Sequence, residues 1–184
     1  MRTLKLQVQI TVDGYMAGPG GAMDWVAGPW SDDLNAHVDA LTETVDTIVL
    51  GRRLAEGFIP AWASGPEGED QASIDWMNAT PKVVISDSLT ESPWPNAVVA
   101  GGDLTETIDG LKSRPGGDLI VYGGGTLVRD LVGRGLVDEL HLFVNPTAVG
   151  AGMPVFGGRA ELELVSARAF DCGIAGLHYR PKRS

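Results

Sequence analysis

Three segments that end in small or charged residues are the parts of this sequence best suited to chemistry. The stretch LIVYGGGTLVRDL, residues 119–131, joins a strand-like apolar run to Gly123, Gly124 and Gly125 and then to residues of helical spacing. A helix that starts after glycines offers its free N–H groups to an anion, and glycine lets that anion come close to the backbone. The dinucleotide pattern G-x-G-x-x-G is not met, because Val128 occupies the place of its last glycine. A phosphate site and a tight turn that binds nothing both fit this stretch.

Two further apolar runs are also followed by residues that could bind phosphate. Gly51, Arg52 and Arg53 follow the run TIVL, and Ser86 follows KVVI. The planar guanidinium fork of arginine suits phosphate oxygens, although an arginine pair at a helix start can also be plain solvated charge. Ligands of open parallel sheets bind beyond the carboxyl ends of the strands. Together the three strand ends predict one site for a phosphorylated ligand.

The hydrophobic periodicity predicts an alternating α/β chain. Leu4 to Val12 alternate with polar residues, which predicts a strand with one buried face, and Ser31 is expected to cap the first helix. Residues 60–72 are expected to form an acidic loop. The remaining strands are expected near 47–50, 82–86, 97–100, 119–122, 137–145, 162–170 and 174–181, and the helices near 32–44, 53–57, 104–113 and 126–133. This order predicts a single domain over residues 1–184, a three-layer α/β/α fold whose mostly parallel central sheet of about eight strands closes with an antiparallel C-terminal hairpin.

Composition narrows the class of protein. The 184 residues carry a net charge of −10 and contain no basic run, which argues against a nucleic-acid partner. No apolar run approaches the roughly 20 residues of a membrane span, and the alternating N-terminus is unlike a secretion signal, so we expect a cytoplasmic protein without a membrane partner. One cysteine, Cys172, excludes an internal disulfide framework. The three histidines, His37, His141 and His178, lack ligand spacing, so no metal site is predicted.

Taken in order, these pieces resemble the dihydrofolate reductase superfamily. The resemblance covers essentially the whole chain and is carried by Asp13-Gly14, the loop with Trp25, Gly51-Arg52, Ser86, the three glycines and the loop ending in Phe156. The segments DGYMAGPGGAMDW and GLVDELHLFVNPTAVGAGMPVF are especially similar to the branch that contains the reductase domain of bacterial riboflavin biosynthesis, the RibD C-terminal domain.

The resemblance implies NADPH as the cofactor and a homodimer as the assembly. It implies that Met16 and Ala17 flank the nicotinamide and that Ser86 lies beside the adenosine end. It further implies that two groups of residues bind the phosphates of the cofactor. The first group is Gly51, Arg52 and Arg53. The second group surrounds the pyrophosphate and consists of Gly123, Gly124, Gly125, Thr126 and Leu127. Leu54 stands where the family often has a threonine, so one hydroxyl contact to phosphate is absent.

The substrate end departs from the family pattern. Classical dihydrofolate reductases hold the pterin with an acidic residue, and an ungapped count back from Gly51 places Asn35 there, with Asp33 reached by a shifted alignment. Asp33 can also serve as a carboxylate that stabilises the helix dipole. The catalytic residues are therefore unidentified, with Asp33 and Asn35 as candidates for catalysis and substrate binding. Trp25 is a third candidate for substrate binding, since Trp25 and Trp30 can cover a ligand or pack under their own loop.

The leading hypothesis is an NADPH-dependent oxidoreductase that transfers a hydride to a small heterocyclic substrate of pyrimidine or pterin type. It would resemble 5-amino-6-(5-phosphoribosylamino)uracil reductase of riboflavin biosynthesis, whose substrate phosphate needs a basic residue, and Lys82 and Arg159 are the candidates. The alternatives are a true dihydrofolate reductase, for which Asn35 lacks the charge, and a non-catalytic nucleotide- or ligand-binding protein on the same fold.

Overall fold

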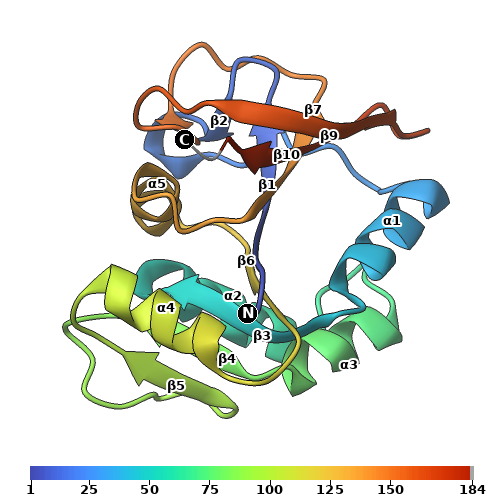
Figure 1. Ribbon diagram of the computed structural model, residues 1–184. Helices are drawn as coiled ribbons and strands as arrows, with labels where there is room; N and C mark the ends of the chain where they lie inside the picture. The colour runs from blue at the N-terminus through green and yellow to red at the C-terminus, as the bar shows by residue number, and fades with distance from the viewer. Residues whose placement is uncertain (183–184) are drawn as a thin grey trace.

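An eight-stranded sheet with helices on both faces forms the centre of the computed structural model, which describes residues 1–182 (Figure 1). The strand order is β5-β4-β3-β6-β1-β7-β10-β9. In this order, each neighbouring pair from β5 through β4, β3, β6 and β1 to β7 is parallel. Strand β10 pairs antiparallel with both β7 and β9. The strands are β1 (Leu4–Thr11), β3 (Val45–Gly51), β4 (Lys82–Ile85), β5 (Ala97–Ala100), β6 (Asp118–Val121), β7 (Glu139–Asn145), β9 (Leu162–Ala169) and β10 (Ala175–Pro181). The predicted parallel sheet with an antiparallel C-terminal hairpin is confirmed.

The helices divide between the two faces of this sheet. Helices α4 (Leu104–Ser113) and α5 (Gly125–Gly133) cover one face, while α1 (Asp32–Thr42), α2 (Arg52–Ala63) and α3 (Gln71–Ala79) lie on the other (Figure 1). A short 3-10 turn η1 (Pro19–Gly21) and a two-stranded ribbon, β2 (Tyr15–Ala17) with β8 (Met153–Pro154), complete the fold. None of the helices in residues 1–182 combines the length and the apolar character that crossing a membrane requires.

The apolar residues form one large cluster and two smaller ones. The large cluster joins α4 and α5 to the sheet through residues such as Ile108, Leu131 and Leu6, all fully buried. A second cluster packs α2 and α3 on β3 and β4, and a third packs α1 on β7 and the β9–β10 turn around Phe143. Because α1 and the α2–α3 pair rest on different strands, the helix layer on their face is divided above the centre of the sheet.

Strand β1 differs from the prediction of one buried face. Its apolar residues face α4 and α5, but the polar side is also covered, with Lys5 8%, Gln7 7% and Thr11 0% exposed. The reason is its central place, because β1 has β6 on one side and β7 on the other and helices above and below. Its polar residues therefore lie inside the protein, beneath the divided helix layer.

The chain between residues 52 and 79 is more helical than predicted. Helix α2 continues through Pro60 to Ala63, and the residues expected to be loop up to 72 lead into α3. An internal proline costs a helix roughly 3 kcal/mol, yet α2 continues past Pro60, and Ile59 beside it is buried. Asp70 begins α3 by accepting a hydrogen bond from the Ser73 backbone N–H at 2.9 Å, and Met77 is buried beneath it. The acidic composition of residues 60–72 favoured the prediction of a loop, so this short helix was not predicted from the sequence.

Gly152 provides a test of how the β2–β8 ribbon is held. Its φ of +149° suits glycine, and a Cβ added there would lie 2.1 Å from the Ala17 carbonyl oxygen, which cannot move freely. We expect Gly152→Ala to lower the free energy of unfolding by about 1–3 kcal/mol in urea denaturation. Gly158→Ala is the matched control, because nothing lies within 4 Å of its added Cβ, and it should change stability by less than about 0.5 kcal/mol. Equal midpoints for the two variants would contradict this packing.

Candidate active site

The three predicted strand ends meet at one side of the sheet. In the parallel register Gly51 lies beside Ile85, and Val49 lies beside Val121, so the residues that follow β3, β4 and β6 come together. We call this group, Gly51 to Arg53, Ser86 and Gly123 to Leu127, the strand-end site. From the sequence, the proximity of these residues could be predicted only from the rule that ligands bind beyond the common carboxyl ends of parallel strands.

Side-chain contacts connect the first two parts of the strand-end site. Arg52 Nη1 donates to Ser88 Oγ at 2.6 Å, and Ser88 Oγ lies 3.2 Å from Ser86 Oγ. Ser86 Oγ also accepts from the Leu89 backbone N–H at 3.2 Å. Arg52 forms an ion pair with Glu56 at 2.8 Å while its side chain stays 44% exposed, and Arg53 is exposed too. The site thus has a cationic rim with hydroxyl groups behind it.

The triple glycine has separate causes at each position. Gly123 and Gly124 adopt φ of +112° and +86°, which L side chains rarely adopt, and Gly124 precedes α5. Gly125 has an ordinary φ, but a Cβ there would lie 1.6 Å from Met153 Sδ, so this methionine packs directly on the backbone. Protein packing therefore accounts for the third glycine, while the turn that the first two form leaves the start of α5 with free N–H groups.

The remaining predicted cofactor residues adjoin this turn. Met16 and Ala17 are 7% and 8% exposed on β2, whose partner strand carries Met153. Thr126 is exposed on the first turn of α5, whereas the Leu127 side chain is buried and packs 3.4 Å from the Cβ position of Gly51. A ligand at Leu127 would therefore meet backbone groups and not its side chain.

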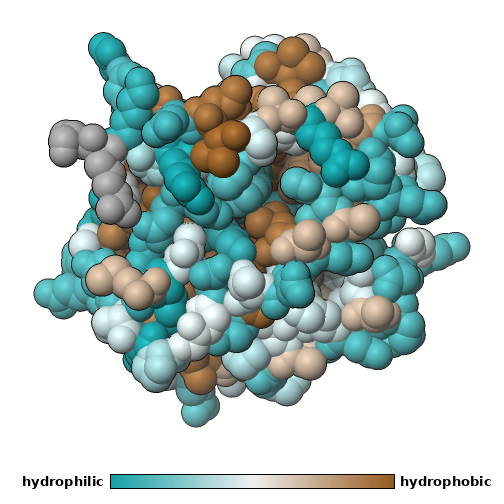
Figure 2. Space-filling view, turned by 45° about the vertical axis from the view of Figure 1, so that its right-hand side comes forward, coloured by the Kyte–Doolittle hydropathy of each residue, from teal (hydrophilic) through white to brown (hydrophobic). Residues whose placement is uncertain are grey.

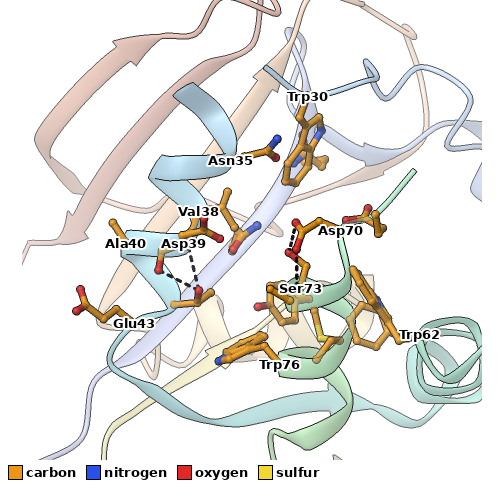
Figure 3. Close-up of a pocket in the computed structure, with 18 residues that line it drawn as sticks. Trp30, Asn35, Val38, Asp39, Ala40, Glu43, Trp62, Asp70, Ser73 and Trp76 are labelled. Carbon is orange, nitrogen blue, oxygen red and sulfur yellow. Dashed lines mark hydrogen bonds between the residues drawn. The ribbon is translucent and has the colours of Figure 1, made fainter. Parts of the chain in front are cut away.

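A cavity of about 840 Å³ lies where the helix layer is divided, above β1 and between α1 and α2–α3 (Figure 3). Gln7 and Gln9 of β1 contribute to its lining, together with residues of all three helices. Figure 2 brings this side forward and shows apolar residues set back among hydrophilic ones. The lining consists of Gln7, Gln9, Trp30, Asn35, Val38, Asp39, Ala40, Thr42, Glu43, Phe58, Trp62, Glu69, Asp70, Ala72, Ser73, Trp76, Met77 and Tyr122.

The predicted substrate residues are placed differently from one another. Asn35 lines the cavity, near Trp30 (Figure 3). Asp33 instead accepts a hydrogen bond from Ser31 Oγ at 2.5 Å, which lowers the pKa of its carboxyl group, and its Oδ2 lies 3.7 Å from Arg168 Nη2. Trp25 is buried in its own loop, where its indole N–H donates to the Ala22 carbonyl at 3.0 Å.

Ser31 occupies the predicted N-cap position of α1, but its side chain does not cap the helix. The Ser31 hydroxyl makes no capping bond to α1, and its oxygen accepts the Cys172 backbone N–H at 3.2 Å. Ser31 and Asp33 therefore connect the start of α1 to the turn between β9 and β10, because that turn offers backbone donors beside the helix end.

Several cavity residues had no signal in the sequence. Trp76 and Ser73 come from the unpredicted α3, and Trp62 from the unpredicted second half of α2. Tyr122 stacks on Phe58 with ring centroids 5.8 Å apart, and burial raises the pKa of its hydroxyl, so Tyr122 stays protonated and can donate a hydrogen bond. Tyr122 immediately precedes Gly123, so the cavity adjoins the glycine turn.

A second polar cluster joins residues that the sequence separates. His141 and His178 are opposite each other in the β7–β10 register, and their rings stack at 4.2 Å. Glu139 Oε2 lies 3.4 Å from His141 Nε2 and 3.6 Å from His178 Nε2, and its Oε1 accepts from Arg180 at 2.8 Å. Burial is the main cause that lowers the pKa of His141 to about 4, so this imidazole is neutral at pH 7. The structure therefore places two of the three histidines, which lack ligand spacing in the sequence, side by side with Glu139.

The sheet order and helix layers define a dihydrofolate reductase-like fold. Dihydrofolate reductase from Enterococcus faecalis, solved in complex with NADP(H), aligns over 98% of this chain and 97% of its own, with a TM-score of 0.64 and 15% identity. The chain belongs to the RibD C-terminal domain family, whose model matches residues 2–175. This agrees with the resemblance found from the sequence.

Two further relatives cover the chain almost completely. The uncharacterized protein YyaP of Bacillus subtilis (strain 168) is 30% identical over 97% of this chain and 94% of its own length. A putative riboflavin biosynthesis protein from Shewanella sp. PV-4 has a TM-score of 0.78 and 22% identity, with both chains fully covered. The Shewanella structure thus shares the fold described above over its whole length.

Buried His141 generates a prediction about stability and pH. Its pKa is about 4 in the folded protein and near 6.5 when the chain is unfolded, so only the unfolded state gains a proton between these values. The stability present above pH 6.5 should therefore fall as the pH drops toward 4, by on the order of 2–3 kcal/mol.

Urea denaturation at closely spaced pH values measures this effect. The variant His141→Gln should show a shallower decline over the same interval, because it lacks the titrating ring. An unfolding free energy that stays constant from pH 6.5 to 4.5 in the native protein would show that His141 is not held neutral.

Proposed function

We propose that this protein is a reductase that uses NADPH to transfer a hydride to a heterocyclic substrate of pyrimidine or pterin type bound in the cavity. One observation carries the proposal: Tyr122, which lines the cavity, is followed directly in the chain by Gly123 of the strand-end site. A cofactor held by the glycine turn would therefore lie next to a residue of the cavity lining. Membership of the RibD C-terminal domain family supports the same activity.

The residues of the strand-end site fit a dinucleotide phosphate. The first helical turn of α5 offers backbone N–H groups beside the positive-φ glycines, which suits a pyrophosphate. The exposed guanidinium groups of Arg52 and Arg53 suit the additional phosphate that distinguishes NADPH from NADH. When bound, the nicotinamide supplies the hydride, and the protein supplies binding and orientation.

The cavity residues would hold the second ring against that nicotinamide. The faces of Phe58 and Tyr122 form an apolar wall, and the Asn35 amide offers both a donor and an acceptor for a ring edge. Holding two reacting rings in a fixed orientation is itself a large source of rate acceleration. The Tyr122 hydroxyl, kept protonated by burial, can donate a hydrogen bond to a substrate oxygen or nitrogen.

The contacts of Asp33 favour this reading over a true dihydrofolate reductase. At the place where the resemblance, with a shifted alignment, puts the pterin-binding carboxylate, Asp33 is engaged by Ser31 and the Asp171 backbone N–H and does not line the cavity. Asn35 lines the cavity but carries no charge. We therefore expect dihydrofolate to be a poor substrate.

The phosphate assignment is tested by titrating NADPH and NADH by calorimetry. Arg52→Ala and Arg53→Ala should each weaken NADPH binding about tenfold and affect NADH less, because a charge-assisted contact to phosphate is lost. Arg159→Ala is the matched control, since this arginine is 88% exposed and pairs with Glu161. Absence of NADPH binding at millimolar concentration would refute the proposal, and wild-type affinity in both arginine variants would refute the phosphate assignment.

A further inference from the structure

We infer that the cavity takes an amino-substituted, uncharged or cationic nitrogen heterocycle that carries no phosphate group. This inference rests on the proposed function, because it names the substrate class of the same site. It departs from the phosphoribosyl substrate that the sequence resemblance implied. Three properties of the lining carry it, namely its charge, its aromatic walls and an unpaired acceptor.

The charge of the lining is entirely negative. Among residues 1–182, it includes Asp39 and Glu43 from α1 and Glu69 and Asp70 at the start of α3, and no lysine or arginine. The Ser73 backbone N–H and hydroxyl lower the pKa of Asp70, so that group stays ionised. A phosphate dianion entering this cavity would meet repulsion without a compensating cation.

The basic side chains closest in sequence to the cavity are engaged elsewhere. Lys82 is 3% exposed, and its Nζ donates to the Met77 and Thr80 carbonyls at 2.6 and 2.7 Å. Lys5 Nζ lies 3.0 Å from Asp118 Oδ2 and donates to the Leu41 carbonyl at 3.0 Å. Arg159, the other candidate for a substrate phosphate, pairs with Glu161. Neither candidate from the sequence lies in the lining.

Aromatic side chains form much of the remaining wall. Trp30 lies across the cavity from Trp62 and Trp76 in Figure 3, and Phe58 and Tyr122 stack beside them. Aromatic faces stack on planar heterocycles and attract cations through their negative π-faces. Carboxylates together with such faces favour a flat ring that is positively charged or carries hydrogen-bond donors along its edge, and they disfavour an anion.

An acceptor of the lining still lacks a partner. Gln7 is 7% exposed, and its Oε1 is buried without a hydrogen bond among the described residues. A buried acceptor left unpaired is unfavourable, so a ligand N–H that reaches it would strengthen binding. Neighbouring Gln9 Oε1 already accepts from Asn145 Nδ2 at 2.8 Å. The cavity thus offers a buried acceptor to N–H donors, which amino-substituted rings supply.

The test compares matched ligands on the protein alone and in the presence of millimolar NADP⁺. The probes are 2,4-diaminopyrimidine, pterin and the pair cytidine and cytidine 5′-phosphate, each titrated by calorimetry. We expect at least one unphosphorylated amino heterocycle to bind, and cytidine to bind at least tenfold more tightly than its phosphate. Preference for the phosphate, or no binding by any unphosphorylated probe at millimolar concentration, would overturn the inference.

Variants connect that preference to the carboxylates and to the glutamine. Glu69→Gln and Asp70→Asn should each reduce the discrimination against cytidine 5′-phosphate several-fold, and asparagine retains the cap of α3. Gln7→Leu should weaken the amino heterocycles, because the acceptor is lost. Glu163→Gln, which neutralises an exposed carboxylate on β9, is the control and should change nothing.

The NADPH titration keeps the two proposals apart. NADPH binding together with preference for the phosphorylated ligand would overturn the substrate class and leave the reductase proposal intact. Selective binding of unphosphorylated rings without any NADPH binding would refute the reductase proposal and retain the assignment of the cavity.

Discussion

The central position of β1 is the constraint on which the site depends. Strand β1 pairs with β6 on one side and β7 on the other, and helices lie on both faces of the sheet, so each face of this strand meets other parts of the protein. Its apolar residues pack against α4 and α5, while Gln7 and Gln9 face the layer formed by α1, α2 and α3. In that layer, α1 packs on β7 and the α2–α3 pair packs on β3 and β4, so the helices are separated above β1. The cavity is the consequence of a polar strand face beneath a divided helix layer.

The same parallel order places a binding edge beside the cavity. Parallel strands end together, so Gly51, Ser86 and Gly123 are neighbours although they are far apart in the chain. Tyr122 belongs to the cavity and the next residue to the glycine turn, so a single chain segment connects the two regions. A reaction between a bound cofactor and a bound ring needs this adjacency.

The sequence predicted most of the elements, because their apolar residues repeat with periods of two or 3.6. It failed where burial is decided by distant partners. Residues 60–72 look like an acidic loop with two prolines, and no helix is predicted for 73–79, yet Trp62 and Met77 pack into the second apolar cluster and hold two helical segments. The alternation of β1 predicted a solvent-facing side, because a period of two cannot reveal what covers the polar face.

The candidate site was predictable to the extent that it follows from backbone rules. Glycines at positive φ after β6 and arginine after β3 carry a local signal, and the structure brings them together. The close approach to Gly125 comes from Met153, a residue of another ribbon, so spacing alone could not identify it. Likewise, only the β7–β10 register joins His141 to His178.

The most direct test of this account is a crystal structure of the protein with NADP⁺. The account predicts the pyrophosphate on the backbone N–H groups that follow Gly124, and the nicotinamide beside Tyr122 at the mouth of the cavity. A cofactor bound away from the glycine turn, or a nicotinamide directed away from Tyr122, would contradict the central claim that one continuous site holds both rings.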